Sequence, residues 1–149
     1  LRGDGSPDAE ELKVVEGIAD WMQVNQEGII ATRPWKVLGE GPQMASAAPL
    51  SAQGFNEGKG KPFTAEDVRF TQSKNGKTLY AIIMGSPTNT VTISSLGGNA
   101  KLLEKKISKI TLLGSKEKVK WTKTAAALSI EAPVAKPSLV AVVFKIALK

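Results

Sequence analysis

The sequence predicts a mainly β protein, an antiparallel β-sandwich preceded by one amphipathic α-helix. Two patterns support this fold class. Apolar residues recur at three- and four-residue spacing over residues 7–25, as on one face of a helix. From residue 63 onward, short apolar runs alternate with clusters of Gly, Pro, Asn and Ser. Six or seven short strands separated by such turns are typical of two packed antiparallel sheets.

The first predicted element is a helix from residue 7 to about residue 25. Ser6 is placed as its N-cap, with Pro7 at the first helical position, where a missing amide is not needed. The apolar stripe consists of Leu12, Val15, Ile18, Ala19 and Met22, widened by Val14 and Trp21. Such a stripe needs a partner surface. We therefore expect the helix to dock on the sandwich, to pair with a second copy, or to fray.

A junction follows the helix. Ile29–Ala31 and Trp35–Leu38 are predicted to be extended, and Pro34 keeps the preceding residue out of the helical region. Residues 39–62 are rich in Gly, Ala, Ser and Pro and contain few large apolar side chains. They are predicted to form a long loop, because little apolar surface is available to offset the entropy of ordering.

The remaining apolar runs are predicted to be strands. They cover residues 68–72, 78–84, 90–94, 107–113, 118–122, 127–131 and 138–148. Asn75-Gly76 between the first two is a strong hairpin signal, because both central residues of a type I′ turn need positive φ. In the last run Val140, Val142, Phe144 and Ile146 alternate with other residues, as on one face of a strand.

The net charge of +6 is confined to one stretch. Residues 101–123 contain eight lysines and two glutamates, and the rest of the chain is neutral in sum. This stretch has no arginine and only one aromatic residue, Trp121. Lysines without arginine forks or stacking aromatics indicate solvated strand faces and protected sheet edges, not a nucleic-acid site. No apolar run approaches the roughly 18 residues of a membrane span, so neither nucleic acid nor membrane is an expected partner.

The sequence contains no cysteine and no histidine. Disulfides, thiolate nucleophiles, and the commonest general base and metal ligand are therefore excluded. The sequence therefore gives no reason to expect a cofactor.

The junction carries a family resemblance. The run Gly28-Ile29-Ile30-Ala31-Thr32-Arg33-Pro34-Trp35, followed by Gly39-Glu40-Gly41-Pro42, resembles the segment after the catalytic barrel in α-L-fucosidases of glycoside hydrolase family 29. Ile30 stands where the family pattern has tyrosine. Upstream, residues 2–6 and 21–25 resemble the loop after the last barrel strand and the end of the last barrel helix. Downstream, residues 63–71 and 79–82 are similar to the opening strands of the family's C-terminal sandwich.

The resemblance implies three segments. Residues 1–28 would be the end of the catalytic (β/α) barrel, residues 29–62 a junction and long loop, and residues 63–149 the C-terminal β-sandwich domain. The parent would be a retaining α-L-fucosidase that removes terminal α-L-fucose from glycans, with this chain a non-catalytic accessory part that braces the barrel. Its partners would be the barrel and, through the parent enzyme, fucosylated glycans. Such a parent is expected to be periplasmic, secreted or lysosomal.

The resemblance also implies where chemistry does not lie. The family's aspartate nucleophile and glutamate acid/base lie upstream on the barrel, and its fucose pocket contains histidines, which this chain lacks. We therefore assign no catalytic, substrate-binding or metal-ligating residue in this chain and expect the fragment alone to be inactive.

Arg33 and Trp35 are predicted to anchor the sandwich against the barrel, and stacking of Trp35 on a sugar is the alternative. Tyr80 and Trp121 are predicted to be core residues. If both faced outward on neighbouring strands, they would instead form the platform of an autonomous carbohydrate-binding module. Burial of Trp35, Tyr80 and Trp121 would count against that alternative function.

Overall fold

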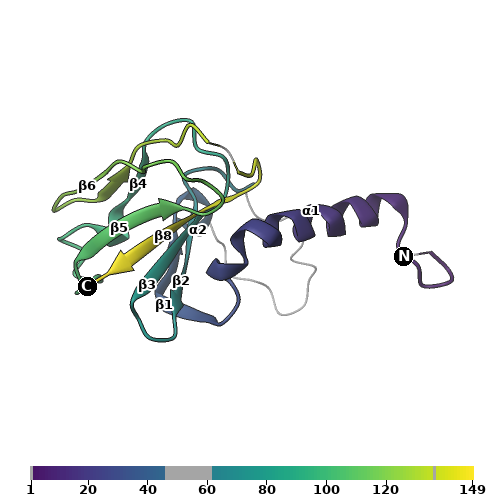
Figure 1. Cartoon of the computed structure of the whole chain (residues 1–149), viewed down its shortest axis with the longest axis horizontal. Coiled ribbons are helices and arrows are strands. Elements are labelled where there is room, and N and C mark those ends of the chain that lie inside the picture. Colours follow the sequence, from purple (N-terminus) through teal and green to yellow (C-terminus); the bar gives the residue numbers. More distant parts are fainter. Residues whose placement is uncertain (1, 46–61, 136) are drawn as a thin grey trace.

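The structure of the protein is a computed structural model that describes residues 2–45, 62–135 and 137–149. A five-stranded sheet and a three-stranded sheet lie face to face, and one long helix projects from them (Figure 1). Every strand pair formed by the described residues is antiparallel. The predicted fold class, a mainly β sandwich preceded by one helix, is confirmed.

The elements follow the predicted order. They are α1 (Ala9–Asn25), a 3₁₀ turn (Gln26–Gly28), β1 (Thr32–Glu40), α2 (Pro42–Ala45), β2 (Val68–Ser73), β3 (Thr78–Ile83), β4 (Val91–Ile93), a second 3₁₀ turn (Ser94–Leu96), β5 (Ile107–Leu112), β6 (Trp121–Lys123), β7 (Leu128–Ile130) and β8 (Val142–Leu148). The larger sheet has the order β1-β2-β3-β8-β5, and the smaller has the order β4-β7-β6.

The main core lies between the two sheets. Leu79, Ile83 and Phe144 from the larger sheet are fully buried, as are Leu128 and Ile130 from the smaller one. These residues alternate along their strands, so burying one face of each sheet accounts for the apolar pattern of the sequence.

The larger sheet is also buried on part of its outer face. Tyr80, Ile82, Ala141 and Val143 form a second apolar cluster, against which Trp21 of α1 packs. The C-terminal end of α1 therefore covers this face, which explains why β3 and β8 are apolar on both sides.

Helix α1 begins two residues later than predicted. The carboxylate of Asp8 accepts hydrogen bonds from the amides of Glu10 and Glu11, and the carboxylate of Glu11 accepts from the amide of Asp8. This capping box makes Asp8 the N-cap in place of Ser6. The amide and hydroxyl of Ser6 both donate to Asp4, so Ser6 belongs to a preceding turn.

The junction differs from prediction in two places. Ile29–Ala31 are not extended: the amides of Ile29 and Ile30 donate to the carbonyl of Gln26, and Ala31 has a φ of 59°. The extended segment Trp35–Leu38 is confirmed within β1. The predicted loop is shorter at its start, because β1 continues to Glu40 and α2 follows. Residues 46–61 of that loop lie outside the described residues.

The base of this long connection is closed by Asp67, whose side chain is fully buried. Its carboxylate accepts hydrogen bonds from the amides of Gln43 (2.8 Å) and Thr64 (3.0 Å), one on each side of the connection. Burial by itself would raise the pKa of Asp67. The hydrogen bonds from Thr64 and Gln43, with the charge of Arg69, outweigh burial and hold that pKa below its usual value.

The predicted β2–β3 hairpin is present, but its turn is not of type I′. Gly76 has a φ of 65°, whereas Asn75 is not among the described non-glycine residues with positive φ. The Gly76 amide donates to the Ser73 carbonyl, and the Asn75 carboxamide oxygen accepts from the Lys77 amide. Asn75 therefore stabilises this turn through its side chain.

The last strand is shorter than predicted. The hydroxyl of Ser138 accepts hydrogen bonds from the amides of Val140 and Ala141, so the chain is still turning there and β8 begins at Val142. Val140, which the alternation grouped with the core-facing positions, is 77% exposed.

Candidate interdomain surface

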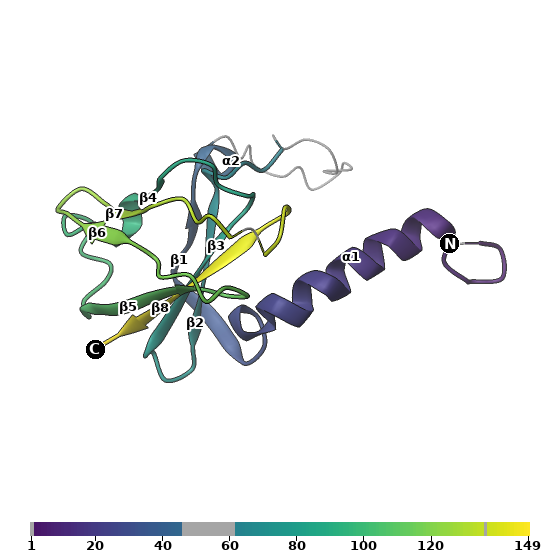
Figure 2. The ribbon, with the colours of Figure 1, turned by 45° about the horizontal axis from the view of Figure 1, so that its top comes forward.

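Helix α1 carries an exposed apolar stripe. Leu12, Val14, Val15 and Ile18 are between 45% and 63% exposed. The helix extends away from the sandwich, and only its C-terminal end reaches the sheet (Figure 2). A contiguous exposed apolar surface of this kind is typical of an interaction site.

The end of α1 is attached by Trp21. Its indole nitrogen donates a 2.9 Å hydrogen bond to the carbonyl of Ala141, 120 residues further along the chain. The side chain of Asn25 is fully buried beside it and donates to the carbonyl of Trp21. The packed part of the Trp21 ring contributes apolar contact area, and the hydrogen bond of its N–H fixes the orientation of the indole.

Glu27, just after the helix, joins the same region to two strands. Its carboxylate accepts a 2.9 Å hydrogen bond from the hydroxyl of Tyr80 on β3 and pairs with the ammonium group of Lys145 on β8. The hydrogen bond from Lys145 is the main cause that lowers the pKa of Glu27. Burial, and then the neighbouring carboxylate, raise the pKa of Tyr80 to about 12.

Gly28 completes this attachment. The hydroxyl of Thr71 donates a 2.5 Å hydrogen bond to its carbonyl, and a Cβ at Gly28 would lie 3.2 Å from the side chain of Val143. We call the four residues Trp21, Asn25, Glu27 and Gly28, at the end of α1 that meets the larger sheet, the helix joint. The joint fixes the direction in which α1 leaves the sandwich.

An apolar groove of about 420 Å³ lies beside the helix joint. It separates the second half of α1 from the outer face of the larger sheet. Its apolar lining includes Ile18, Trp21, Ile29, Ile82, Met84 and Val140. Ile18 belongs both to this groove and to the exposed stripe, so the two form one continuous apolar surface.

The two residues predicted to be interdomain do not lie at this surface. Trp35 is only 8% exposed and packs edge-on against Phe70 in the main core, with ring centroids 5.0 Å apart. Arg33 is exposed on β1, an edge strand. Their interdomain role stays a prediction, and Trp35 has a sufficient structural role within the sandwich itself.

Tyr80 and Trp121 do not form a common platform. Tyr80 is 4% exposed in the outer-face cluster, whereas Trp121 packs against the core between the sheets and is half-buried. The two side chains therefore lie on opposite sides of the larger sheet. This arrangement argues against a carbohydrate-binding platform made from the pair.

Within the described ranges, no group of three or more acidic, histidine or cysteine side chains could hold a metal ion. Among the helices of those ranges, none has the length and apolar character needed to cross a membrane.

The fold and this surface define a β-sandwich domain with a projecting apolar helix. The chain belongs to the family of α-L-fucosidase C-terminal domains, whose family model matches residues 61–149. A comparison with curated proteins finds no match.

Solved structures of fucosidases share the fold over nearly the whole chain, α1 included. Thermotoga maritima α-L-fucosynthase matches 99% of the chain at 16% identity with a TM-score of 0.65. Thermotoga maritima α-fucosidase in complex with fucose matches 98% of the chain at 15% identity with a TM-score of 0.64. α-L-Fucosidase isoenzyme 1 from Paenibacillus thiaminolyticus matches 97% of the chain at 20% identity with a TM-score of 0.57. The chain spans 28% of the length of each.

Proposed function

We propose that this chain is the C-terminal part of a retaining α-L-fucosidase, in which α1 is the last helix of the catalytic barrel and the sandwich braces that barrel. The observation that carries the proposal is the combination of a firmly attached helix end with an uncovered apolar stripe. The family membership of residues 61–149 and the share of fucosidase structures that the chain covers support it.

The energetics of the stripe favour a partner. Full burial of a large apolar side chain stabilises by roughly 1.5–3 kcal/mol. Because the four stripe residues are about half exposed, covering them would contribute roughly half of that per side chain. The apolar groove extends this surface onto the sandwich, so a barrel could contact helix and sheet together.

Hydrolysis would come from the rest of the enzyme. Retaining glycosidases need two carboxylates roughly 5 Å apart across the scissile bond. The sequence has no histidine for a pocket of the kind that the family resemblance implies. We therefore predict that the purified chain releases no nitrophenol from a nitrophenyl fucoside, while the longer parent does.

The first test is an intact mass, with N-terminal sequencing, of the protein purified from its source. A species that begins well before Leu1 and hydrolyses the fucoside is the expected result. A mass equal to the 149 residues alone would contradict the proposal.

A paired variant tests bracing directly. V14Q/I18Q should lower the melting temperature of the parent enzyme, because it would bury two polar groups without partners in the interface with the barrel. It should lower that of the 149-residue chain much less, because both side chains are more than half exposed there. The matched control is K13Q/E16Q, which changes two exposed polar residues of the same helix. Equal shifts for both pairs in the parent enzyme would refute the bracing role.

A further inference from the structure

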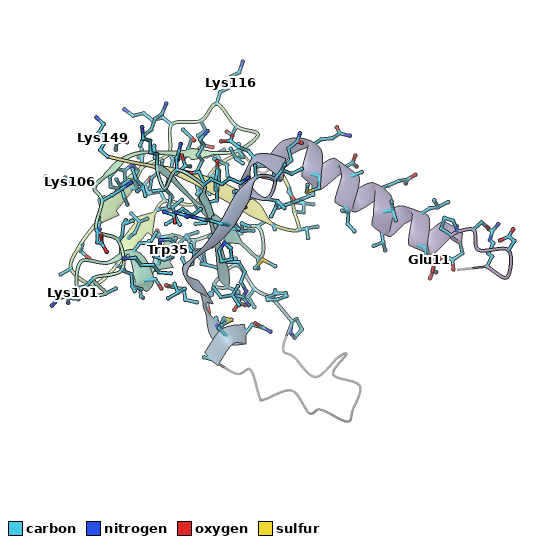
Figure 3. All side chains as sticks on the ribbon, turned by 90° about the horizontal axis from the view of Figure 1, so that it is seen from below. Glu11, Trp35, Lys101, Lys106, Lys116 and Lys149 are labelled. Atoms are coloured by element: carbon cyan, nitrogen blue, oxygen red, sulfur yellow. The ribbon has the colours of Figure 1, made fainter. Side chains whose placement is uncertain are left out.

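A second groove, of about 620 Å³, lies between the edge strands of the two sheets. It follows β5 of the larger sheet and β6 of the smaller one, and the segment 113–120 that connects them forms part of its wall. Three lysines line it: Lys109, Lys116 and Lys118. We call it the lysine groove. Figure 3 shows Lys116 projecting away from the sandwich.

Among the described residues, no carboxylate forms an ion pair with a lysine of the lysine groove. The ion pairs of those residues involve Lys36, Lys120 and Lys145. All three groove lysines are exposed. Their positive charges therefore face solvent together and favour an anionic ligand.

The carboxylate in the lining, Glu117, is already engaged. Its two oxygens accept hydrogen bonds from the amides of Val134 (3.1 Å) and Ala135 (2.9 Å). The hydrogen bond from Ala135, followed by that from Val134, lowers the pKa of Glu117. Glu117 thus stays negatively charged and is held at the backbone of the neighbouring loop, without an ion pair to a groove lysine. Three lysines and one carboxylate leave the lining with a net charge of +2.

Two further groups in the groove suit a sugar. Trp121 packs against the core and lines the groove with the rest of its half-buried side chain. An aromatic surface of this kind suits the apolar C–H groups of a pyranose ring. The hydroxyl oxygen of Ser115 accepts from the Glu117 amide, so its hydrogen can be donated to a ligand.

We propose that the lysine groove binds an anionic polysaccharide, with sulfate or carboxylate groups on the three lysines and a sugar ring on Trp121. A single aromatic residue and the absence of arginine disfavour a nucleic-acid strand. The groove shares no lining residue with the helix joint, although the connection 113–120 begins beside Val24 of α1. The proposal therefore goes beyond the bracing role and does not depend on it.

The test measures binding of the 149-residue chain to a sulfated fucan, to the same polymer after desulfation, to polygalacturonate and to polyphosphate. We expect the sulfated fucan, the polygalacturonate or both to bind, with amide chemical-shift changes confined to residues 108–121. The two polymers distinguish sulfate from carboxylate as the anionic group. The desulfated polymer should not bind, and affinity should fall with salt.

Matched variants localise the site. K109Q/K116Q/K118Q should weaken binding about tenfold in total, because each exposed ion pair contributes only a few-fold in affinity. K74Q/K77Q/K101Q removes the same charge elsewhere and should weaken it less than about twofold. W121L should weaken binding several-fold and W121F should retain most of it, with melting curves checking that both fold. The lysine triples alter only exposed side chains, so their folding is not at risk.

Three results would overturn the proposal. One is that neither charged polysaccharide binds. Another is an equal loss of affinity in the two lysine triples, which would mean attraction by net charge alone. The third is that polyphosphate binds as tightly as the polysaccharides and that W121L has no effect on binding. This result would mean a simple anion site without sugar recognition.

Discussion

The hydroxyl of Tyr80 donates a 2.9 Å hydrogen bond to the carboxylate of Glu27, 53 residues earlier in the chain. Lys145 pairs with the same carboxylate from the neighbouring strand. One side chain beyond the end of α1 therefore links the helix to two neighbouring inner strands of the larger sheet, β3 and β8. The protonation state of that contact can be measured, because Tyr80 is the one tyrosine of the sequence.

Because burial and Glu27 raise the pKa of Tyr80 to about 12, we expect the tyrosinate absorbance to titrate with a midpoint near pH 12. E27Q should lower that midpoint, because the carboxylate is the second cause of the shift after burial. In denaturant the midpoint should return to about 10. Far-UV circular dichroism recorded in parallel would show that the chain stays folded, and a folded-state midpoint near 10 would contradict the described contact.

The sign of this shift predicts an effect on stability in alkali. The pKa of Tyr80 is higher in the folded chain than in the unfolded chain. Its contribution to the free energy of unfolding is therefore fully present below about pH 10 and is lost as the pH rises toward about 12. Y80F removes the ionisable group, so its free energy of unfolding should lack this alkaline loss. Urea unfolding at several pH values between 8 and 12 would test this.

We predict that W21F weakens the attachment of α1. Phenylalanine keeps most of the buried ring but cannot donate to the Ala141 carbonyl, a loss of about 1 kcal/mol. Amide hydrogen exchange over residues 17–25 should accelerate, while the strands of the main core keep their protection. V14A, at a position that is 63% exposed, is the control and should leave exchange near the joint unchanged. Similar acceleration in both variants would mean that the indole N–H does not hold the helix.

D67N should destabilise the chain by about 1–3 kcal/mol, because an amide group cannot accept all the hydrogen bonds that the buried carboxylate receives. The exposed neighbour variant E66Q should change stability by less than about 0.5 kcal/mol. Urea unfolding at pH 7 gives both values.

The lowered pKa of Asp67 also predicts an acid dependence. The pKa of Asp67 is lower in the folded chain than in the unfolded chain. The carboxylate therefore contributes to the free energy of unfolding above about pH 4, and this contribution is lost as the pH falls through the folded pKa. The difference in unfolding free energy between the wild-type chain and D67N should therefore shrink below pH 4. A difference that stays constant down to pH 2 would contradict the account.

W35A should cost about 3–5 kcal/mol, as expected for an aromatic side chain removed from a packed core. R33A, two residues away on the same strand, should stay within about 0.5 kcal/mol in the isolated chain. If R33A destabilises the parent enzyme but not this chain, its predicted interdomain role gains support. An equal cost for both substitutions in the isolated chain would conflict with the placement of Trp35.

The sequence predicts most of the fold because its apolar periodicity is strong. The helix stripe ending near Asn25 and the hairpin around Asn75 both appear where expected. Element boundaries are less predictable, since single side-chain hydrogen bonds decide them. Asp8 takes the N-cap because Ser6 is held by Asp4, and Ser138 delays the start of β8.

The candidate surface is harder to predict than the fold. The exposed stripe on α1 follows from helical spacing, but Glu27 has no pattern that marks its contacts with distant strands. The junction motif predicts an interdomain role for Trp35, which stays a prediction, but it does not reveal that the ring packs against Phe70 in the main core. Such long-range pairings depend on strand order, which local spacing does not encode.

Because α1 is fixed only at its C-terminal end, it behaves mechanically as a lever arm. Its 17 residues span roughly 25 Å at about 1.5 Å per residue. The part from the pivot at Trp21 to the start at Ala9 is roughly 18 Å long, so a rotation of about 10° there would move the start of the helix by roughly 3 Å. Small changes in packing at the pivot would thus produce larger displacements at the N-terminal end of α1. Such displacements would change the position of a domain bound to that end relative to the sandwich.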